Sequence, residues 1–257
     1  AAGQQQPVLL PLGIARHFGA ARMQLDSYVP WARKRPSLVW RGSTTGFTSL
    51  RRDFVDGLAN HPNLSRDDVD VRFTSVVQGN DGWVRGRGAP PLARGLSRMQ
   101  MMGHRYVLSL EGNDVATDLK WKLASSSLVL MPKPTKEGWL MEGKLEPWVH
   151  YVPVDSPDDV EAKMQWCREH QAEVKDIIGN STAFMWQFVV PESERDIVST
   201  ILWRYRANVK WDAGSGGGSS GSGGGSSGSC RGGRPPRAAR RAARPHVGPS
   251  RRPLSRR

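Results

Sequence analysis

Gly112, Asn113 and Asp114 stand where an apolar run of the sequence gives way to a helical pattern, a position where α/β proteins often bind ligands. The N–H groups that open a helix are unpaired, and the positive end of the helix dipole attracts anions. Glycine lets a ligand approach the backbone, and Asn113 or Asp114 can cap a helix that begins at Val115. The pattern therefore fits a phosphate-binding turn, and it equally fits an ordinary turn followed by a helix cap.

Two further segments are expected at the same edge of the sheet. "WRGSTTG" places Arg41 and Ser43 after a strand, where an arginine can contact a diphosphate through two hydrogen bonds or can simply lie on the surface in a glycine turn. "MEGKLEPWVHYVPV" contains Glu142, a carboxylate that can accept hydrogen bonds from two ribose hydroxyls. The same segment contains His150, and a lone histidine before a strand is more often structural than catalytic.

The sequence lacks the motifs of several other kinds of site and of a membrane-spanning segment. The serines at 125–127 lack the Gly-x-Ser-x-Gly elbow of a hydrolase, and no Walker loop or complete dinucleotide fingerprint occurs. Cys167 and Cys230 have no zinc-site spacing and cannot form a disulfide framework. The sequence has no apolar run of the 18 or more residues that a membrane span requires.

The elements that must position these residues alternate between strands and helices along the chain. Apolar runs and alternation predict strands, and apolar residues at helical spacing predict helices. Strands are expected over 38–40, 69–77, 106–110, 128–131 and 150–154, and helices over 50–58, 96–103, 115–125, 156–178, 180–190 and 192–211, with Ser156 as the cap of its helix. This alternation predicts parallel pairing through right-handed crossovers, hence a doubly wound, Rossmann-like α/β sheet.

Charge and composition divide the chain of 257 residues into a folded part and a tail. The net charge is +13, but ten arginines and no acidic residue follow Asp212, which leaves 27 basic and 24 acidic residues in the rest. We predict a flexible Gly/Ser linker over 212–229 and a disordered Arg/Pro-rich tail over 230–257. The tail is either a basic arm for nucleic acid or another anionic surface, or a solvated extension. Because the chain starts at Ala1 without an initiator methionine, we expect it to be part of a longer protein.

Three segments, in order and spacing, resemble glycosyltransferase family 90. They are "WRGSTTG", "YVLSLEGNDVATDLKWKLASSSLVLMPKP" and "GWLMEGKLEPWVHYVPVDSPDDVEAKMQWCREHQAEVKDIIGNSTAF", within a match that covers about Trp31 to Phe188. The family includes Rumi-type protein O-glucosyltransferases and O-xylosyltransferases, fungal capsule-associated xylosyltransferases and bacterial lipopolysaccharide-modifying relatives. The resemblance implies inverting, metal-independent transfer of a sugar such as glucose or xylose from a UDP-sugar to a protein or glycan hydroxyl.

The resemblance also implies an architecture, the C-terminal half of a two-Rossmann GT-B glycosyltransferase. On this interpretation residues 37–211 form the donor-binding domain, and residues 1–36 are a remnant of an N-terminal region or an interdomain segment. No cofactor or metal is expected. If the full-length protein is eukaryotic, the resemblance implies the lumen of the endoplasmic reticulum or Golgi.

By position in the family's motifs, eight residues look like contacts to the nucleotide-sugar donor. Arg41 and Ser43 would face the diphosphate, the turn from Gly112 to Thr117 would cradle it, and Glu142 would hold the ribose. The relevant residues are Arg41, Ser43, Gly112, Asn113, Asp114, Thr117, Lys120 and Glu142. Asp118 stands where the animal enzymes have a basic residue, so Lys120 is a possible substitute for that charge.

The resemblance leaves the catalytic residue unassigned. An inverting transferase needs a general base for the acceptor hydroxyl, and the family is expected to carry that carboxylate in its N-terminal Rossmann domain. Asp26 is the only acidic residue before Trp40, and it gives no convincing match. The chain is therefore either a fragment of an active enzyme or a donor-binding half without turnover. The alternative function is a catalytically inactive α/β binding protein with an arginine-rich, nucleic-acid-binding arm.

Overall fold

A computed structural model of the chain describes residues 18, 19, 21, 28–82 and 92–208. The predictions for the linker at 212–229, the tail at 230–257 and Cys230 lie outside these residues, as does most of the segment 1–36. The described residues as far as Val190 belong to one compact unit. The helix α8 (Pro191–Asn208) belongs to a second unit. Within the described part of the chain, no helix is long and apolar enough to cross a membrane.

Five parallel strands form the sheet of the first unit, in the order β2-β1-β3-β4-β5. Their bounds are β1 (Arg35–Ser43), β2 (Val69–Ser75), β3 (His104–Leu108), β4 (Leu128–Met131) and β5 (Val152–Pro153). The predicted doubly wound α/β sheet is confirmed, because parallel strands alternate with helices along the chain.

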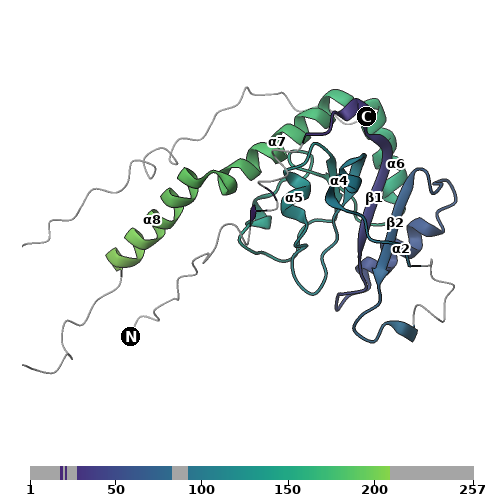
Figure 1. Cartoon of the computed structure of the whole chain (residues 1–257), viewed down its shortest axis with the longest axis horizontal. Coiled ribbons are helices and arrows are strands. Elements are labelled where there is room, and N and C mark those ends of the chain that lie inside the picture. Colours follow the sequence, from purple (N-terminus) through teal and green to yellow (C-terminus); the bar gives the residue numbers. More distant parts are fainter. Residues whose placement is uncertain (1–17, 20, 22–27, 83–91, 209–257) are drawn as a thin grey trace, which may run out of the picture. The chain divides into compact units, whose positions relative to one another are not determined.

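Helices cover both faces of this sheet. Their bounds are α2 (Leu50–Ala59), α4 (Arg98–Met102), α5 (Leu119–Leu123), α6 (Asp159–Glu169) and α7 (Gln171–Val189), with short 3-10 turns η1 (Trp31–Arg33) and η2 (Glu142–Lys144). In Figure 1, α4 and α5 lie on one side of β1, and α2 and α6 lie on the other. The crossover through α2 takes the chain outward to β2, and the crossover through α4 brings it back past β1 to β3.

Alternating side chains of the strands explain why both faces are buried. Leu38 and Trp40 of β1 pack into the cluster under α2 and α6, whereas Val39 between them packs into the cluster under α4 and α5. The same alternation continues in β3 and β4, so these strands read as unbroken apolar runs in the sequence. The polar residues that could do chemistry are thereby confined to the strand ends.

The strand order reverses between β1 and β3, and this creates a topological switch point. The chain leaves β1 toward α2 on one face and leaves β3 toward α5 on the other. The loops after these two strands diverge, and in sheets of this order the resulting crevice is where ligands bind.

The helix that was predicted near this crevice is shorter in the structure and begins later. The helix expected over 115–125 is the five-residue α5, which begins at Leu119 with Asp118 as its N-cap. The prediction that Asn113 or Asp114 caps it is therefore wrong, because residues 113–118 form bends and turns that bury Ala116 beside Leu119 instead.

The C-terminal helices are also divided differently from the prediction. The helix expected over 156–178 breaks at His170 into α6 and α7, and α7 then runs on to Val189 with no new start at Asn180. Ser156 is not a side-chain cap; instead, Asp159 Oδ2 accepts hydrogen bonds from the N–H groups of Asp155 (2.9 Å) and Ser156 (3.0 Å).

Candidate functional site

A pocket of about 360 Å³ lies at the carboxyl ends of β3 and β4, beside the start of α2. It is bordered by three loops and by η2. The lining residues are Thr48, Ser49, Leu50, Asp53, Ser109, Glu111, Val115, Ala116, Leu119, Met131, Pro132, Lys133, Pro134, Thr135, Lys136 and Glu142. We call it the carboxyl-edge pocket. Its position agrees with the ligand crevice that the strand order predicts.

Arg51 of α2 ties together the two diverging chain segments at the base of this crevice. Its guanidinium donates to the carbonyls of Ser43 (3.1 Å), Leu110 (3.0 Å) and Glu111 (3.1 Å) and to Thr45 Oγ1 (2.6 Å). Burial lowers the pKa of Arg51, and the nearby Asp118 opposes that shift. Since the guanidinium is engaged on several sides, its role is to fix the ends of β1 and β3 relative to each other.

Gly112 is packed directly against this guanidinium. A Cβ at position 112 would lie 2.9 Å from Arg51 Nη2 and 2.9 Å from Thr45 Oγ1, closer than real Cβ contacts come. The sequence predicted the close approach of a ligand at this glycine, whereas the group that the structure places there is the Arg51 guanidinium.

The loop after β4 brings basic side chains to the rim of the carboxyl-edge pocket. Glu111 accepts hydrogen bonds from the N–H and hydroxyl of Thr135 (2.9 and 2.5 Å) and from Lys136 N (3.1 Å), and Lys136 Nζ lies 3.4 Å from the same carboxylate. Burial alone would raise the pKa of Glu111, but these hydrogen bonds and the lysine charge outweigh it and lower the pKa. Lys136 Nζ also donates to the carbonyl of Gly112 (3.2 Å). Lys133 lines the pocket as well, so two ammonium groups border it from this loop.

Two polar groups line the deeper wall of the pocket. Glu142 is 2% exposed, and its Oε2 accepts a hydrogen bond from the N–H of Gly138 (2.6 Å). Ser109, which follows β3, is 3% exposed, and its hydroxyl has no hydrogen-bond partner among the residues that the structure describes. A buried hydroxyl without a partner costs free energy, so a ligand that supplied one would bind more tightly.

Lys120 lies near this wall without lining it. Burial lowers the pKa of Lys120, whereas the charge of Glu142 raises it, and the ammonium lies 5.0 Å from the centre of the Phe18 ring. The charge predicted to reach the diphosphate from Lys120 is therefore directed in part toward Glu142 and an aromatic ring.

Asp118, the residue that departs from the animal family members, has a structural partner. Its Oδ2 lies 2.5 Å from Nζ of Lys122, which is 1% exposed and also donates to the carbonyl of Leu108 (2.7 Å). Burial lowers the pKa of Lys122, and Asp118 opposes that shift. The carboxylate at 118 thus compensates a buried lysine one turn along α5.

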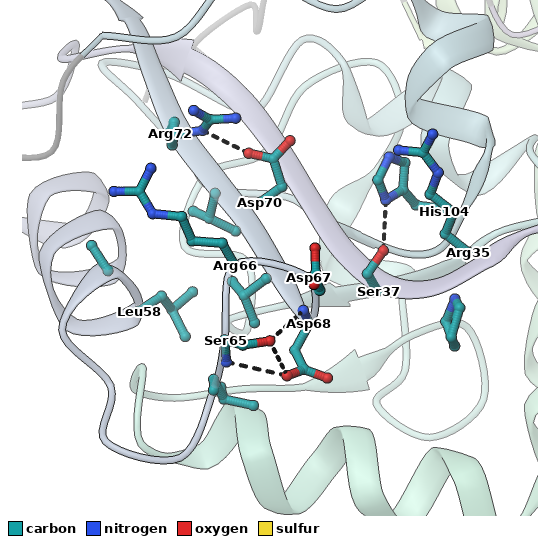
Figure 2. A pocket seen from close by; sticks show the side chains of 15 residues that line it. Arg35, Ser37, Leu58, Ser65, Arg66, Asp67, Asp68, Asp70, Arg72 and His104 are labelled. Carbon is teal, nitrogen blue, oxygen red and sulfur yellow. Dashed lines mark hydrogen bonds and ion pairs between the residues drawn. The ribbon is translucent and has the colours of Figure 1, made fainter.

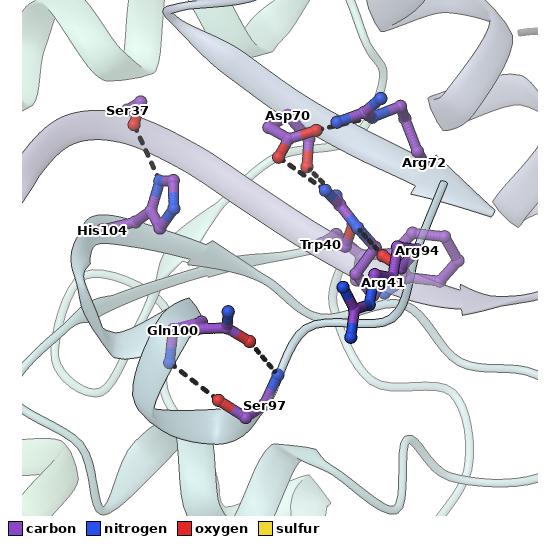
Figure 3. Close-up of polar contacts among 9 residues, drawn as sticks. All are labelled: Ser37, Trp40, Arg41, Asp70, Arg72, Arg94, Ser97, Gln100 and His104. Atoms are coloured by element: carbon purple, nitrogen blue, oxygen red, sulfur yellow. Dashed lines mark hydrogen bonds and ion pairs between the residues drawn. The ribbon is translucent and has the colours of Figure 1, made fainter. Parts of the chain in front are cut away.

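Arg41 lies away from the carboxyl-edge pocket. Its side chain is 6% exposed, its Nη2 lies 2.6 Å from Asp70 Oδ2 on the neighbouring strand, and it donates to the backbone carbonyls of Trp40, Asp70 and Arg94 (Figure 3). Arg72 Nε holds the second oxygen of Asp70 at 2.7 Å. Burial would raise the pKa of Asp70, but the two arginines outweigh it and lower the pKa.

The remaining predicted donor contacts lie on the exposed side of the crevice. Ser43 ends β1, and its hydroxyl lies 3.4 Å from Thr45 Oγ1. Asn113, Asp114 and Thr117 are exposed, and Asp114 Oδ1 accepts a hydrogen bond from the N–H of Val115 (2.8 Å). The structure therefore brings Glu142 to the pocket wall, whereas Gly112 packs against Arg51 without lining the pocket and Arg41 is paired with Asp70. The donor contacts themselves stay predictions.

Other residues singled out in the sequence are structural. His150 Nδ1 accepts a hydrogen bond from the N–H of Glu146 (3.0 Å), and its ring packs against Phe184 at 5.2 Å. The hydroxyls of the serines at 125–127 donate to backbone carbonyls of neighbouring segments.

A larger pocket of about 560 Å³ lies at the opposite end of the sheet, at the start of β1, β2 and β3 (Figure 2). It contains acidic and basic side chains together, among them Arg66, Asp68 and His104. The His104 ring is hydrogen-bonded to the Ser37 hydroxyl (2.8 Å), and its pKa is lowered by burial and by nearby arginines. Because ligands in doubly wound sheets bind at the carboxyl ends, we take the carboxyl-edge pocket as the candidate functional site.

The sequence predictions missed four residues of this site: Ser109, Glu111, Lys133 and Lys136. All four lie in the loops that follow β3 and β4, so the rule that ligand-binding residues collect after strand ends would have identified them. Arg51 carried no such signal, since it stands inside a helix.

A doubly wound parallel sheet with a charged pocket at the carboxyl ends of its strands defines the chain as an α/β protein of the class that binds ligands at this edge of the sheet. The chain belongs to glycosyl transferase family 90, whose family model matches residues 16–213. The predicted family membership is thereby confirmed.

Individual relatives agree with this assignment. The O-glucosyltransferase LpsA of Dichelobacter nodosus is 35% identical over 203 residues, which cover 78% of this chain and 58% of the relative. The O-glucosyltransferase rumi of Drosophila melanogaster is 26% identical over 213 residues, 79% of this chain and 49% of the relative. The chain thus spans about half of the length of these proteins.

A comparison of folds finds the solved structure of Anabaena Alr3699/HepE in complex with UDP, at 13% identity and a TM-score of 0.39. The match covers 74% of this chain and 52% of that one. At this score the likeness carries no argument about the site.

Proposed function

We propose that this chain is the donor-binding part of an inverting glycosyltransferase that transfers a sugar from a UDP-sugar to a protein or glycan hydroxyl. The observation that carries the proposal is the carboxyl-edge pocket of a family 90 chain, with two lysines at its rim and a buried carboxylate in its wall. The lysines would form charge-assisted hydrogen bonds with a diphosphate, and the carboxylate would accept hydrogen bonds from ribose hydroxyls. The family resemblance supplies the GT-B architecture and the UDP.

The pocket can do two things for the reaction. Lys133 and Lys136 would stabilise the negative charge that grows on the diphosphate as the bond between the sugar C1 and the phosphate oxygen breaks. The ammonium groups would take the part that a metal ion plays in other transferases, so we propose transfer without a metal. Glu142 would fix the nucleoside through its ribose hydroxyls.

Inversion requires a group on the other side of the sugar. The acceptor oxygen attacks C1 from the face opposite the diphosphate, its proton passes to a general base, and UDP leaves with the bonding electron pair. By the family resemblance we expect this base in the N-terminal Rossmann domain of the full-length protein. If that protein is eukaryotic, we expect it in the lumen of the endoplasmic reticulum or Golgi.

Calorimetric titration with UDP tests the proposal. UDP should bind the wild-type chain, and Lys136→Met should weaken binding by about 1.5–3 kcal/mol, the contribution of a hydrogen bond to a charged group. Lys175→Met, at an exposed lysine of α7, is the matched control and should bind like the wild type. Arg41→Lys tests whether Arg41 contacts the diphosphate. If it does, UDP affinity should fall; the pairing of Arg41 with Asp70 implies that UDP affinity stays unchanged. Absence of UDP binding by a folded wild-type chain would refute the proposed donor site.

A further inference from the structure

A third pocket, of about 400 Å³, lies where the loop before β5 meets α6 and α7. It is lined by Trp148, Trp166, Glu173, Asp176, Ile177 and Asn180. We call it the tryptophan pocket. Trp148 precedes β5 and Trp166 stands in the last turn of α6, so the pocket is at the amino end of the strands, away from the carboxyl-edge pocket.

The two indole rings are fixed in place by their neighbours. They meet edge to face, with ring centres 4.7 Å apart and planes at 71°. Behind Trp166 the His170 ring stacks at 4.5 Å, with an angle of 8° between the planes. Lys163 Nζ lies 4.9 Å from the centre of the Trp148 ring. The aromatic surface is therefore preorganised, and an ammonium group already occupies the neighbourhood of one ring.

Trp148 is held at the surface at a cost in backbone energy. Its φ is 65°, in the left-handed region that bulky residues seldom adopt, and its N–H donates to the Tyr151 carbonyl (2.7 Å). The indole is nevertheless 40% exposed. The strain thus supports an exposed aromatic ring, which agrees with a binding role better than with core packing.

Three hydrogen-bonding side chains border the indoles on one face of α7. Glu173, Asp176 and Asn180 are spaced by three and four residues, and the buried Ile177 lies between them. All three are exposed, and among the described residues none of their side chains has a hydrogen bond or an ion pair. The pocket therefore combines a flat apolar wall with unused acceptors at its edge.

We propose that the tryptophan pocket binds an uncharged pyranose sugar, as a site separate from the donor pocket. A pyranose ring has an apolar face of C–H groups that packs on an indole, and its equatorial hydroxyls donate hydrogen bonds to carboxylates and amides at the ring's edge. A phosphate or an acidic sugar would be repelled by Glu173 and Asp176. A small organic cation would have to approach beside the ammonium of Lys163. The uncharged sugar is the ligand that meets neither obstacle.

Saturation-transfer NMR with maltotriose and xylotriose at millimolar concentration tests this proposal. We expect transfer to the sugar C–H protons, and a loss of affinity of about tenfold in Asp176→Ala, the value for one hydrogen bond to a charged group. Asp176 has no partner in the described chain, so this variant should fold normally. Trp148→Phe should weaken binding while it keeps an aromatic ring. Trp186→Phe is the matched control, because Trp186 is an exposed tryptophan of α7 that lies outside the pocket.

Three outcomes would overturn the proposal. One is no saturation transfer to either sugar, the second is equal loss in Trp186→Phe and Trp148→Phe, and the third is displacement of the sugars by choline, which would make the pocket a cation site. Saturation with UDP and the Lys136→Met variant should leave sugar binding unchanged. A failure of the donor site is therefore distinguishable from a failure of the tryptophan pocket.

Discussion

An alanine at position 112 would place its Cβ 2.9 Å from both Arg51 Nη2 and Thr45 Oγ1. Since Arg51 is held by three backbone carbonyls, it cannot withdraw without losing hydrogen bonds. We expect Gly112→Ala to lower the free energy of unfolding by about 1–3 kcal/mol, as overpacking does. Gly95→Ala is the control, because nothing lies within 4 Å of a Cβ there. Urea denaturation measures both, and equal values for the two variants would contradict the packing argument.

Asp118 and Lys122 should behave as one unit in stability. Asp118→Asn leaves the buried ammonium of Lys122 without its carboxylate, and we expect a loss of about 3 kcal/mol in the free energy of unfolding. The same substitution should lower the pKa of Lys122 further, because burial then acts unopposed by Asp118.

The double variant Asp118→Asn/Lys122→Met should recover part of that loss, because it no longer buries a charge. A double-mutant cycle from denaturation curves measures the coupling between the two side chains. A change below about 0.5 kcal/mol in Asp118→Asn would show that the pair contributes nothing.

A residue whose place is set by local backbone geometry can be identified from the sequence, whereas the distant partner of a long side chain cannot. Gly112 was identified because a strand-to-helix turn restricts which residue can stand there. Arg41 and Asp70 are separated by 29 residues, and their contact follows from the pairing of β1 with β2. No local pattern in the sequence contains that pairing.

At the scale of elements, α4 depends on Ser97, the N-cap residue that precedes it. Ser97 Oγ accepts a hydrogen bond from Gln100 N (3.2 Å), and Gln100 Oε1 accepts one from Ser97 N (2.8 Å), which together form a capping box (Figure 3). We expect Ser97→Ala to lower the free energy of unfolding by about 1 kcal/mol. Ser49 precedes α2 without a side-chain cap hydrogen bond. We therefore expect Ser49→Ala to lower the free energy of unfolding by about 0.5 kcal/mol or less. Thermal denaturation measures both variants. Equal losses would mean that the capping box is not what stabilises α4.

The bounds of β4 were predicted more accurately than those of α5, for a physical reason. β4 matches its predicted bounds because "LVLM" is buried on both faces of a parallel sheet, so the apolar run and the strand have the same length. The segment 115–118 has the apolar spacing of a helix. In the structure this segment is not helical, and Ala116 and Leu119 are nevertheless buried in the same cluster. The break at His170 gives no signal in the sequence, since neither proline nor glycine stands there.

For the molecule as a whole, buried histidines predict how stability changes with pH. Burial lowers the pKa of His104 and of His150, so the folded protein binds these protons less readily than the unfolded chain, which takes them up near pH 6.5. Stability is therefore greatest above this pH and falls as pH drops below it, by at most about 1.4 kcal/mol per pH unit for each histidine.

His104→Asn should reduce that dependence, because the amide can still form a hydrogen bond with the Ser37 hydroxyl but does not titrate in this range. The double variant with His150→Asn should reduce it further. Urea denaturation at several pH values between 7.5 and 5.5 measures the slope. An unaltered slope in His104→Asn would show that this imidazole is equally basic in the folded and unfolded states.

The position of β2 gives the Arg41–Asp70–Arg72 network a consequence for solubility. β2 is an outer strand of the sheet, and an outer strand offers unpaired backbone groups to any passing chain. The carbonyl of Phe73 on this strand already accepts a hydrogen bond from the N–H of Ala93. Asp70 and Arg72 are charged, and another strand could pair beside them only if these charges lost their hydration. We therefore expect the network that contains Arg41 to disfavour the joining of separate copies of this sheet edge to edge into aggregates.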